Sequence, residues 1–297
     1  MFGRAVVRML IVICGVLVGV RAAAALTPDE GILAFASDRD GDYDIYLLDV
    51  HSGFAHNLRR GDHTIHDDQP SWSPDGMRLV YRASLDGDSH LMIYDMADGS
   101  SHEVMPNTIG SPNMTPVWTP DGSQISLVVP GGILGIVDAG SGQTQFPLTT
   151  IYPLTHIWSP DGRQIIYSRP YSVFSVRLYA LDLLTGRQRS LTPARGAFTF
   201  PAWSPASDAL AVIHQRDIYV LDPDCLPACV ELGQRLTESA EFKVWPTWSP
   251  DGRQIAFECL DNASSQICLI DVESGVRRQL THSPDHVRNV KPAWRPR

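Results

Sequence analysis

A short phrase built around tryptophan recurs along this 297-residue chain at nearly even intervals. Four copies read Trp-Ser/Thr-Pro-Asp-Gly in full, and the six copies begin at Trp72, Trp118, Trp158, Trp203, Trp248 and Trp294. Successive tryptophans are 46, 40, 45, 45 and 46 residues apart. Repeats of this length are typical of β-propellers, in which each repeat forms one four-stranded blade. The chain is therefore predicted to be an all-β, six-bladed β-propeller.

Each repeat follows the same order of strands and turns. After the tryptophan, proline suits the second position of a turn and glycine supplies the positive φ that the turn needs. An alternating apolar strand follows, then a second strand that ends in Asp, as at residues 45–49 and 218–222. Period-2 strands joined by tight turns predict four-stranded antiparallel blades.

Proline stands two residues before five of the six tryptophans, and His156 takes that place in the sixth copy. A strand tolerates proline at an edge that needs no hydrogen-bond donor, and the innermost strand of a blade has such an edge beside the central channel. We therefore expect the segment before each tryptophan to be the inner strand. The tryptophans themselves should pack between neighbouring blades.

The two ends of the repeat region are complementary. Residues 31–35 match a second strand with no inner strand before it, and residues 290–294 supply the missing inner strand. The C-terminal strand is expected to pair into the first blade and close the ring, which leaves no open sheet edge. One propeller domain over residues 26–297 follows.

The first 25 residues have the layout of a secretory signal peptide. Arg4 and Arg8 precede an apolar run at residues 9–20, and small residues follow at 22–25. The run is short for a membrane span, so we expect cleavage, no remaining span and a periplasmic or secreted protein. Loss of three arginines would shift the net charge from −9 to −12. This balance disfavours nucleic acids and anionic membrane surfaces as partners.

Four cysteines remain after the signal segment. Cys225 and Cys229 lie four residues apart in one loop, and Cys259 and Cys268 lie on consecutive strands. An even number in an exported chain predicts the disulfides Cys225–Cys229 and Cys259–Cys268. A zinc site is the alternative.

Residues 38–44 carry alternating carboxylates around Gly41, at Asp38, Asp40, Asp42 and Asp44. Such alternation can bring oxygen ligands together, so calcium is the one cofactor that the sequence suggests. The spacing is not that of an EF-hand, and a solvated turn is the alternative.

A second acidic segment leads into the second blade. His63, His66, Asp67 and Asp68 form a weaker metal pattern, for which a solvated loop is the alternative. Together with Asp86 and Asp88, these residues make the first two blades an acidic sector that suits a basic partner or a cation.

The variable loops should lie on the face opposite the Pro-Asp-Gly turns, and loops on a rigid scaffold usually carry specificity. The positions three residues before each tryptophan should ring the channel mouth on that face: Gln69, Thr115, Thr155, Phe200, Trp245 and Lys291. Trp245 lies outside the repeated phrase, and an aromatic anchor beside a cation suits a peptide or sugar ligand. We predict that these residues and His156 bind the partner, with loop packing as the alternative.

The phrase Trp-Ser-Pro-Asp-Gly, followed by Ile-Tyr-x-x-Asp and a closing Leu-Thr, resembles the TolB-type propeller repeat. Residues 248–257, 267–271 and 280–281 form the cleanest copy. The resemblance covers residues 31–297 and implies a periplasmic propeller that binds partner proteins of the cell envelope. TolB also carries an N-terminal α/β domain, which we do not expect here. Related repeats accompany peptidase domains, but no Gly-x-Ser-x-Gly phrase occurs in this sequence.

These observations favour an exported, non-catalytic, monomeric propeller that binds a protein or peptide of the envelope or exterior through its variable-loop face and channel mouth. One alternative is a hydrolase or lyase acting on a carbohydrate, calcium-dependent if the acidic loop binds that ion. It would require paired carboxylates, or a carboxylate and a histidine, converging on the channel. A sensor of a small ligand is a third possibility.

Overall fold

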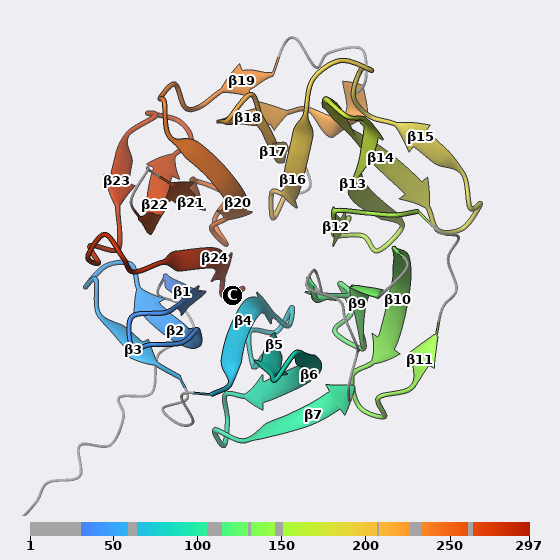
Figure 1. Cartoon of the computed structure of the whole chain (residues 1–297). Coiled ribbons are helices and arrows are strands. Elements are labelled where there is room, and N and C mark those ends of the chain that lie inside the picture. The colour runs from blue at the N-terminus through green and yellow to red at the C-terminus, as the bar shows by residue number, and fades with distance from the viewer. Residues whose placement is uncertain are drawn as a thin grey trace, which may run out of the picture.

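The computed structural model describes residues 31–58, 64–105, 115–129, 132–145, 151–206, 208–225, 233–260 and 264–297. Within these ranges the chain forms six four-stranded antiparallel sheets, which stand as blades around a central axis (Figure 1). The six-bladed propeller predicted from the repeat period is confirmed. The predicted signal peptide at residues 1–25 lies outside the described residues.

Blade 1 joins the two ends of the propeller and contains β24 (Asn289–Trp294), β1 (Ile32–Ser37), β2 (Asp44–Asp49) and β3 (Ala55–Asn57). Blade 2 contains β4 (His66–Trp72), β5 (Arg78–Leu85), β6 (Asp88–Asp95) and β7 (Ser101–Met105). Blade 3 contains β8 (Val117–Trp118), β9 (Gln124–Val129), β10 (Ile133–Asp138) and β11 (Thr144–Gln145).

Blade 4 contains β12 (Thr155–Trp158), β13 (Gln164–Ser172), β14 (Ser175–Asp182) and β15 (Gln188–Ser190). Blade 5 contains β16 (Phe198–Trp203), β17 (Leu210–His214), β18 (Asp217–Leu221) and β19 (Gln234–Arg235), with a short 3₁₀ helix η1 (Pro223–Cys225) after β18. Blade 6 contains β20 (Phe242–Trp248), β21 (Gln254–Leu260), β22 (Ser265–Asp271) and β23 (Arg277–Gln279). In the described part of the chain, no helix has the length and hydrophobicity needed to cross a bilayer.

The predicted ring closure is present. β24 pairs antiparallel with β1, with Trp294 opposite Leu33 and Asn289 opposite Ser37. In Figure 1, the red C-terminal strand lies beside the blue N-terminal strand. The pairing gives blade 1 its inner strand, as the complementary ends of the repeat region predict.

The repeated phrase after each tryptophan forms a hydrogen-bonded turn. In blade 6, the Ser249 hydroxyl accepts the backbone N–H of Gln254 at 2.9 Å and donates to the Asp251 carboxylate at 2.6 Å. That carboxylate also accepts the N–H of Arg253 at 3.1 Å. Matching contacts form around Ser73, Thr119 and Ser159. Turn closure therefore accounts for the recurrence of Ser/Thr and Asp in the phrase.

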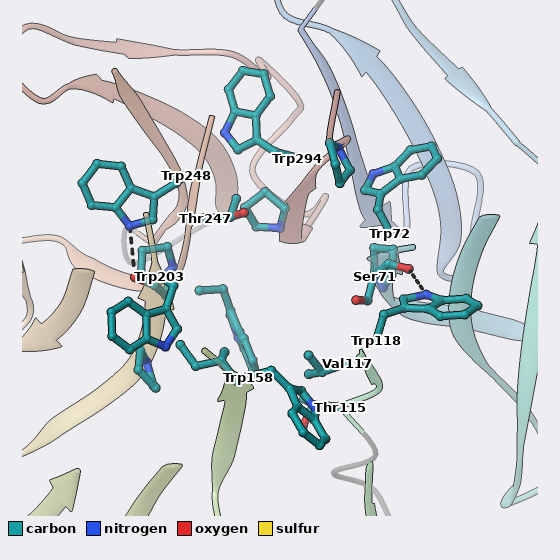
Figure 2. A pocket seen from close by; sticks show the side chains of 18 of the residues that line it. Ser71, Trp72, Thr115, Val117, Trp118, Trp158, Trp203, Thr247, Trp248 and Trp294 are labelled. Atoms are coloured by element: carbon teal, nitrogen blue, oxygen red, sulfur yellow. Dashed lines mark hydrogen bonds between the residues drawn. The ribbon is translucent and has the colours of Figure 1, made fainter. Parts of the chain in front are cut away.

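At three junctions a tryptophan indole joins a blade to the blade before it through a hydrogen bond. Trp118 donates its indole N–H to the Ser71 carbonyl at 3.1 Å (Figure 2), and Trp72 and Trp248 donate to the carbonyls of Ala293 and Ala202. In all three cases the acceptor immediately precedes the tryptophan of the neighbouring blade. The predicted packing between blades is therefore present, with a specific hydrogen bond added to it.

Three junctions between blades depart from this pattern. Trp158 donates its indole N–H to the Ser126 hydroxyl at 2.8 Å, and this hydroxyl donates to the Val117 carbonyl at 3.1 Å. The Ser126 side chain therefore bridges the indole and the carbonyl. The indole N–H groups of Trp203 and Trp294 have no hydrogen-bond partner among the described residues. The junctions between blades 4 and 5 and between blades 6 and 1 therefore lack the indole hydrogen bond.

The predicted disulfide between Cys259 and Cys268 is confirmed. The two residues lie on β21 and β22 with their Cα atoms 5.9 Å apart, and both are buried. The register places Cys268 opposite Phe257 and Cys259 opposite Gln266, so the bridge crosses the strand pair diagonally. The predicted Cys225–Cys229 bridge lies outside the described residues, because Cys229 is not among them.

Replacing Trp248 by Phe is expected to destabilise the protein more than replacing Trp294 by Phe, by about 1 kcal/mol. Both tryptophans are buried and both changes remove the same volume, but Trp248→Phe leaves the Ala202 carbonyl without its donor. Urea unfolding of the two variants measures the difference. Equal destabilisation would contradict a stabilising role for the indole hydrogen bond.

Replacing Cys259 and Cys268 together by Ala should lower the free energy of unfolding by about 2–3 kcal/mol, since the bridge restricts a short loop of the unfolded chain. The measurement is urea unfolding with and without a reducing agent. The reductant should lower the free energy of unfolding more in the parent protein than in the double variant. Equal effects on both would show that another bridge dominates.

Candidate functional site

The inner strands of the blades enclose a central channel with a cavity of about 620 Å³. All seven residues predicted to bind a partner line it: Gln69, Thr115, Thr155, His156, Phe200, Trp245 and Lys291. The six motif tryptophans also line the cavity and surround it in Figure 2. Their regular spacing predicted only a packing role, so their contribution to the channel wall was not predicted.

Four inner strands carry the same irregularity at the residues predicted to ring the channel mouth. In β4, β16, β20 and β24, two residues face one residue of the partner strand, which is a β-bulge. The first bulged residue has a positive φ between 51° and 58° in each case, at Gln69, Phe200, Trp245 and Lys291. Proline follows each of them and cannot donate to the ladder.

This conformation costs about 1–3 kcal/mol for each residue other than glycine, and strained residues of this kind are often found at functional sites. Blade 4 differs, because His156 replaces proline and β12 pairs regularly, with His156 opposite Tyr167. The replacement of proline by His156 thus coincides with an inner strand whose pairing over residues 155–158 has no bulge.

One half of the mouth is aromatic and cationic. The rings of Phe200 and Trp245 lie 4.5 Å apart between centroids, at an interplanar angle of 57°. The Lys291 ammonium lies 5.0 Å from the centre of the Trp245 ring, within cation–π range. These residues come from blades 5, 6 and 1, so the predicted aromatic pair beside a cation is formed by three consecutive blades.

The buried residue Glu258 supports this half from behind. Its carboxylate accepts the Ser265 hydroxyl at 2.8 Å and the backbone N–H of Lys291 at 3.3 Å. Burial raises the pKa of Glu258 and lowers the pKa of Lys291, and the charge of each opposes the shift of the other. Glu258 was not predicted as a site residue, although a charged residue inside the apolar strand at 255–259 was a usable signal.

The other half of the mouth is polar and incompletely hydrogen-bonded. Gln69 Oε1, Thr115 Oγ1 and His156 Nδ1 are buried atoms without a hydrogen-bond partner among the described residues. They come from blades 2, 3 and 4, and each of these residues lines the cavity. Buried polar atoms are rarely left unpaired, so these three distinguish this part of the cavity wall from the aromatic half.

In this half, the side chain whose pKa is shifted by its surroundings is that of His156. Only 2% of its surface is exposed, and its Nε2 lies 2.8 Å from the Ser126 hydroxyl that also accepts the Trp158 indole N–H. Burial lowers the pKa of His156 to about 4. The imidazole is therefore neutral near pH 7, and its Nδ1 donates or accepts according to the tautomer.

Comparison with known proteins assigns the family. Residues 11–207 match the family described as TolB beta propeller domain. The chain belongs to this family. The Tol-Pal system protein TolB of Histophilus somni (strain 2336) is 42% identical over 41 residues, which are 14% of this chain and 9% of that protein. The resemblance to the TolB-type repeat is confirmed.

Solved structures agree with the architecture of the TolB-type propeller. TolB from Acinetobacter baumannii superposes with a TM-score of 0.76 at 18% identity, over 90% of this chain and 67% of that one. A putative TolB from Agrobacterium tumefaciens gives 0.65 at 18% identity, over 90% and 95% of the two chains. A chain of a nidogen/laminin complex gives 0.66 at 11% identity, over 89% and 97%. At these identities the likeness shows the fold alone.

The acidic loop of this TolB-type propeller uses its carboxylates for protein contacts. Asp38 accepts the N–H of Arg288 at 2.6 Å, Asp44 accepts the Asn57 amide at 2.7 Å, and Asp40 accepts the hydroxyl of Tyr46. The Asp42 side chain is buried. Calcium binding by these four residues stays a prediction.

The carboxylates of the second acidic segment are also engaged or buried. Arg82 donates to both oxygens of Asp68 at 2.7 and 2.6 Å, and Asp67 is buried. His66 Nδ1 accepts the N–H of Tyr43 at 3.3 Å, whereas His63 lies outside the described residues. Across the described ranges, no group of three or more His, Cys, Asp or Glu side chains has a metal-binding arrangement.

His156 should make the stability of this propeller depend on pH. Because its folded pKa lies below the unfolded value, the neutral side chain contributes fully above about pH 6.5, and this contribution falls as the pH drops toward 4. The loss amounts to at most about 3 kcal/mol. Replacing His156 by Gln should remove this component, as urea unfolding at several pH values would show. Parallel pH profiles for the parent and the variant would contradict the assignment.

Proposed function

We propose that this propeller binds an extended segment of a partner protein at the mouth of its central channel, on the face of the variable loops. The observation that carries the proposal is the division of the mouth into two unlike halves. Blades 5, 6 and 1 contribute an aromatic pair and a cation, and blades 2, 3 and 4 contribute buried polar atoms that have no hydrogen-bond partner within the described ranges.

A polypeptide segment matches both halves. An apolar or aromatic side chain would pack against Phe200 and Trp245, where tryptophan often dominates binding energy. Backbone or side-chain polar groups on the other side would pair with Gln69, Thr115 and His156, which removes the cost of burying them unpaired. The cavity volume of about 620 Å³ lies within the usual range for ligand sites.

Charge at the mouth narrows the ligand further. Lys291 lines the cavity, and the described lining residues include no Asp or Glu. A neutral or acidic segment therefore suits the channel better than a basic one. The same composition favours binding over the carbohydrate-cleaving alternative, because glycoside hydrolysis commonly requires two carboxylates beside the bond that breaks.

Family membership supports the cellular setting of the proposal. The resemblance to TolB implies a periplasmic propeller with partners in the cell envelope, and the N-terminal sequence has the layout of an export signal. We therefore place the function in the periplasm or outside the cell, with a protein or peptide as the partner.

Selection of peptides on the full chain tests the proposal. Peptides from a random display library, selected on the immobilised protein and then labelled, should bind in fluorescence anisotropy titrations. Replacing Trp245 by Ala should weaken them at least about tenfold, because the change removes the central aromatic anchor. Gln69→Ala should weaken the same peptides by a smaller factor.

The matched control is Phe54→Ala, which removes an exposed aromatic ring from a turn on the opposite face of the disc. It should leave peptide affinity unchanged. Peptides that bind equally well to the parent and to Trp245→Ala would overturn the proposal for the channel mouth.

A further inference from the structure

The hairpin between β13 and β14 extends beyond the rest of blade 4. β12 pairs with β13 only as far as Thr155 opposite Ser168, and the last pair between β14 and β15 is Tyr179 opposite Ser190. The β13–β14 pairing continues through Arg169 opposite Arg177 to Ser172 opposite Ser175. Residues 169–177, here named the finger, therefore project from the face of the variable loops.

The tip of the finger is apolar and open. Val173 and Phe174 form its turn, and each side chain is 91% exposed. Tyr171, the next aromatic residue toward the base, is 56% exposed. Such residues are normally withdrawn from water in a soluble domain, so a tip of this kind marks an interaction surface.

The base of the finger is cationic. The Arg177 guanidinium stacks on the Tyr171 ring at 3.5 Å, and that of Arg169 lies 4.4 Å from the centre of the Tyr179 ring. The short connection to the next blade holds the base in place, because the Val176 N–H donates to the Gly196 carbonyl at 3.2 Å. Arg195, beside that glycine, is exposed and adds a third cation.

Blade 4 itself carries no acidic residue on this face. Between residues 139 and 207 the acidic residues are Asp161 and Asp182, and both lie in turns of the opposite face. The acidic residues of this face in the next blade and the loop that follows it, Asp217, Glu238 and Glu241, form ion pairs with Arg235, Lys243 and Arg277. The acidic loops belong to blades 1 and 2, and blade 1 lies across the ring from blade 4 (Figure 1). The net charge of −9 is the sum over the whole chain, so it does not describe the local charge around blade 4.

We propose that the finger docks on an anionic lipid bilayer, with Val173 and Phe174 in the interfacial region of the membrane and the arginines at the lipid phosphates. Strand geometry puts about 10 Å between the tip and the arginine pair, since Arg177 stands three positions after Phe174. This separation matches the burial depth of about 5–10 Å that is typical of interfacial anchors.

The order of side chains favours a bilayer over a protein pocket. From the tip inward, the finger presents apolar residues, then Tyr171, then arginines, which is the order of polarity across a membrane interface. Arginines at this position can extend toward phosphates while their stems stay on apolar surface. Blades 1 and 2 would be repelled by the same surface, so the disc would meet it tilted, with blade 4 nearest.

Sedimentation with vesicles tests the proposal on the full chain. Vesicles of mixed phosphatidylglycerol and phosphatidylcholine should bind the protein, and pure phosphatidylcholine vesicles should bind it at least about tenfold more weakly. Phe174→Ser should reduce binding to the anionic vesicles about tenfold or more. Arg169→Gln with Arg177→Gln should reduce it by a similar factor and weaken its dependence on salt.

The matched control uses an exposed apolar residue on the opposite face of the same blade. Leu184 is 95% exposed in the turn after β14, and Leu184→Ser should leave vesicle binding unchanged. All variants keep residues 1–25, so any contribution of that segment is common to them. Circular dichroism of each variant confirms that it remains folded.

A depth measurement separates the finger from other membrane contacts. Phe174→Trp should be quenched by brominated phosphatidylglycerol, whereas Leu184→Trp should not. Equal effects of Phe174→Ser and Leu184→Ser, or no quenching at Phe174→Trp, would overturn the proposal. The proposal would also be overturned if Phe174→Ser left vesicle binding unchanged but abolished a protein complex or self-association. That outcome would identify the finger as a protein-binding surface.

Discussion

Blades of a propeller are separate sheets, so no backbone ladder runs from one blade to the next. The ring depends on contacts between side chains of neighbouring sheets and on one pairing between strands far apart in sequence. Here the indole N–H of a tryptophan reaches a carbonyl in the preceding blade at three junctions, and Trp158 reaches Ser126 at a fourth. The same tryptophans line the channel, so one residue type both fixes the spacing of the blades and shapes the cavity between them.

The mouth of the channel shows how a repeat can hold unlike residues in like positions. In four inner strands a bulge that includes the proline turns the backbone of Gln69, Phe200, Trp245 and Lys291 in the same way, whatever the side chain. Because the backbone geometry belongs to the repeat, the side chains at these positions are free to differ. Unlike side chains thus stand on one constant backbone, and His156 is a position where the backbone itself departs from the pattern.

Much of this arrangement could be predicted from the sequence. The tryptophan period specified the number of blades, the prolines identified the inner strands, and the offset of three residues selected side chains that do line the cavity. These features repeat, so one physical explanation applies to six positions. The disulfide between Cys259 and Cys268 was predictable for a related reason, since strand assignment placed both residues on one hairpin.

Features that occur once were harder to predict. Glu258 is a single charge on a strand that otherwise looks apolar, and its contact with Lys291 joins strands from two blades. Three carboxylates of the acidic loop contact Arg288, Asn57 and Tyr46, and only folding brings Arg288 near. The projection of β13 and β14 depends on where their neighbours stop pairing, which local sequence patterns do not define within a few residues.

The pairing of β24 with β1 also has a consequence for the order of events during synthesis. Blade 1 is the first blade to emerge and the last to be completed, because its inner strand lies some 250 residues beyond its second strand. Until that strand arrives, β1 presents an unpaired edge, and apolar residues such as Leu33 and Phe35 lack part of their cover. Contacts this distant in sequence slow folding. Aggregation through this edge must therefore be avoided until β24 has been synthesised.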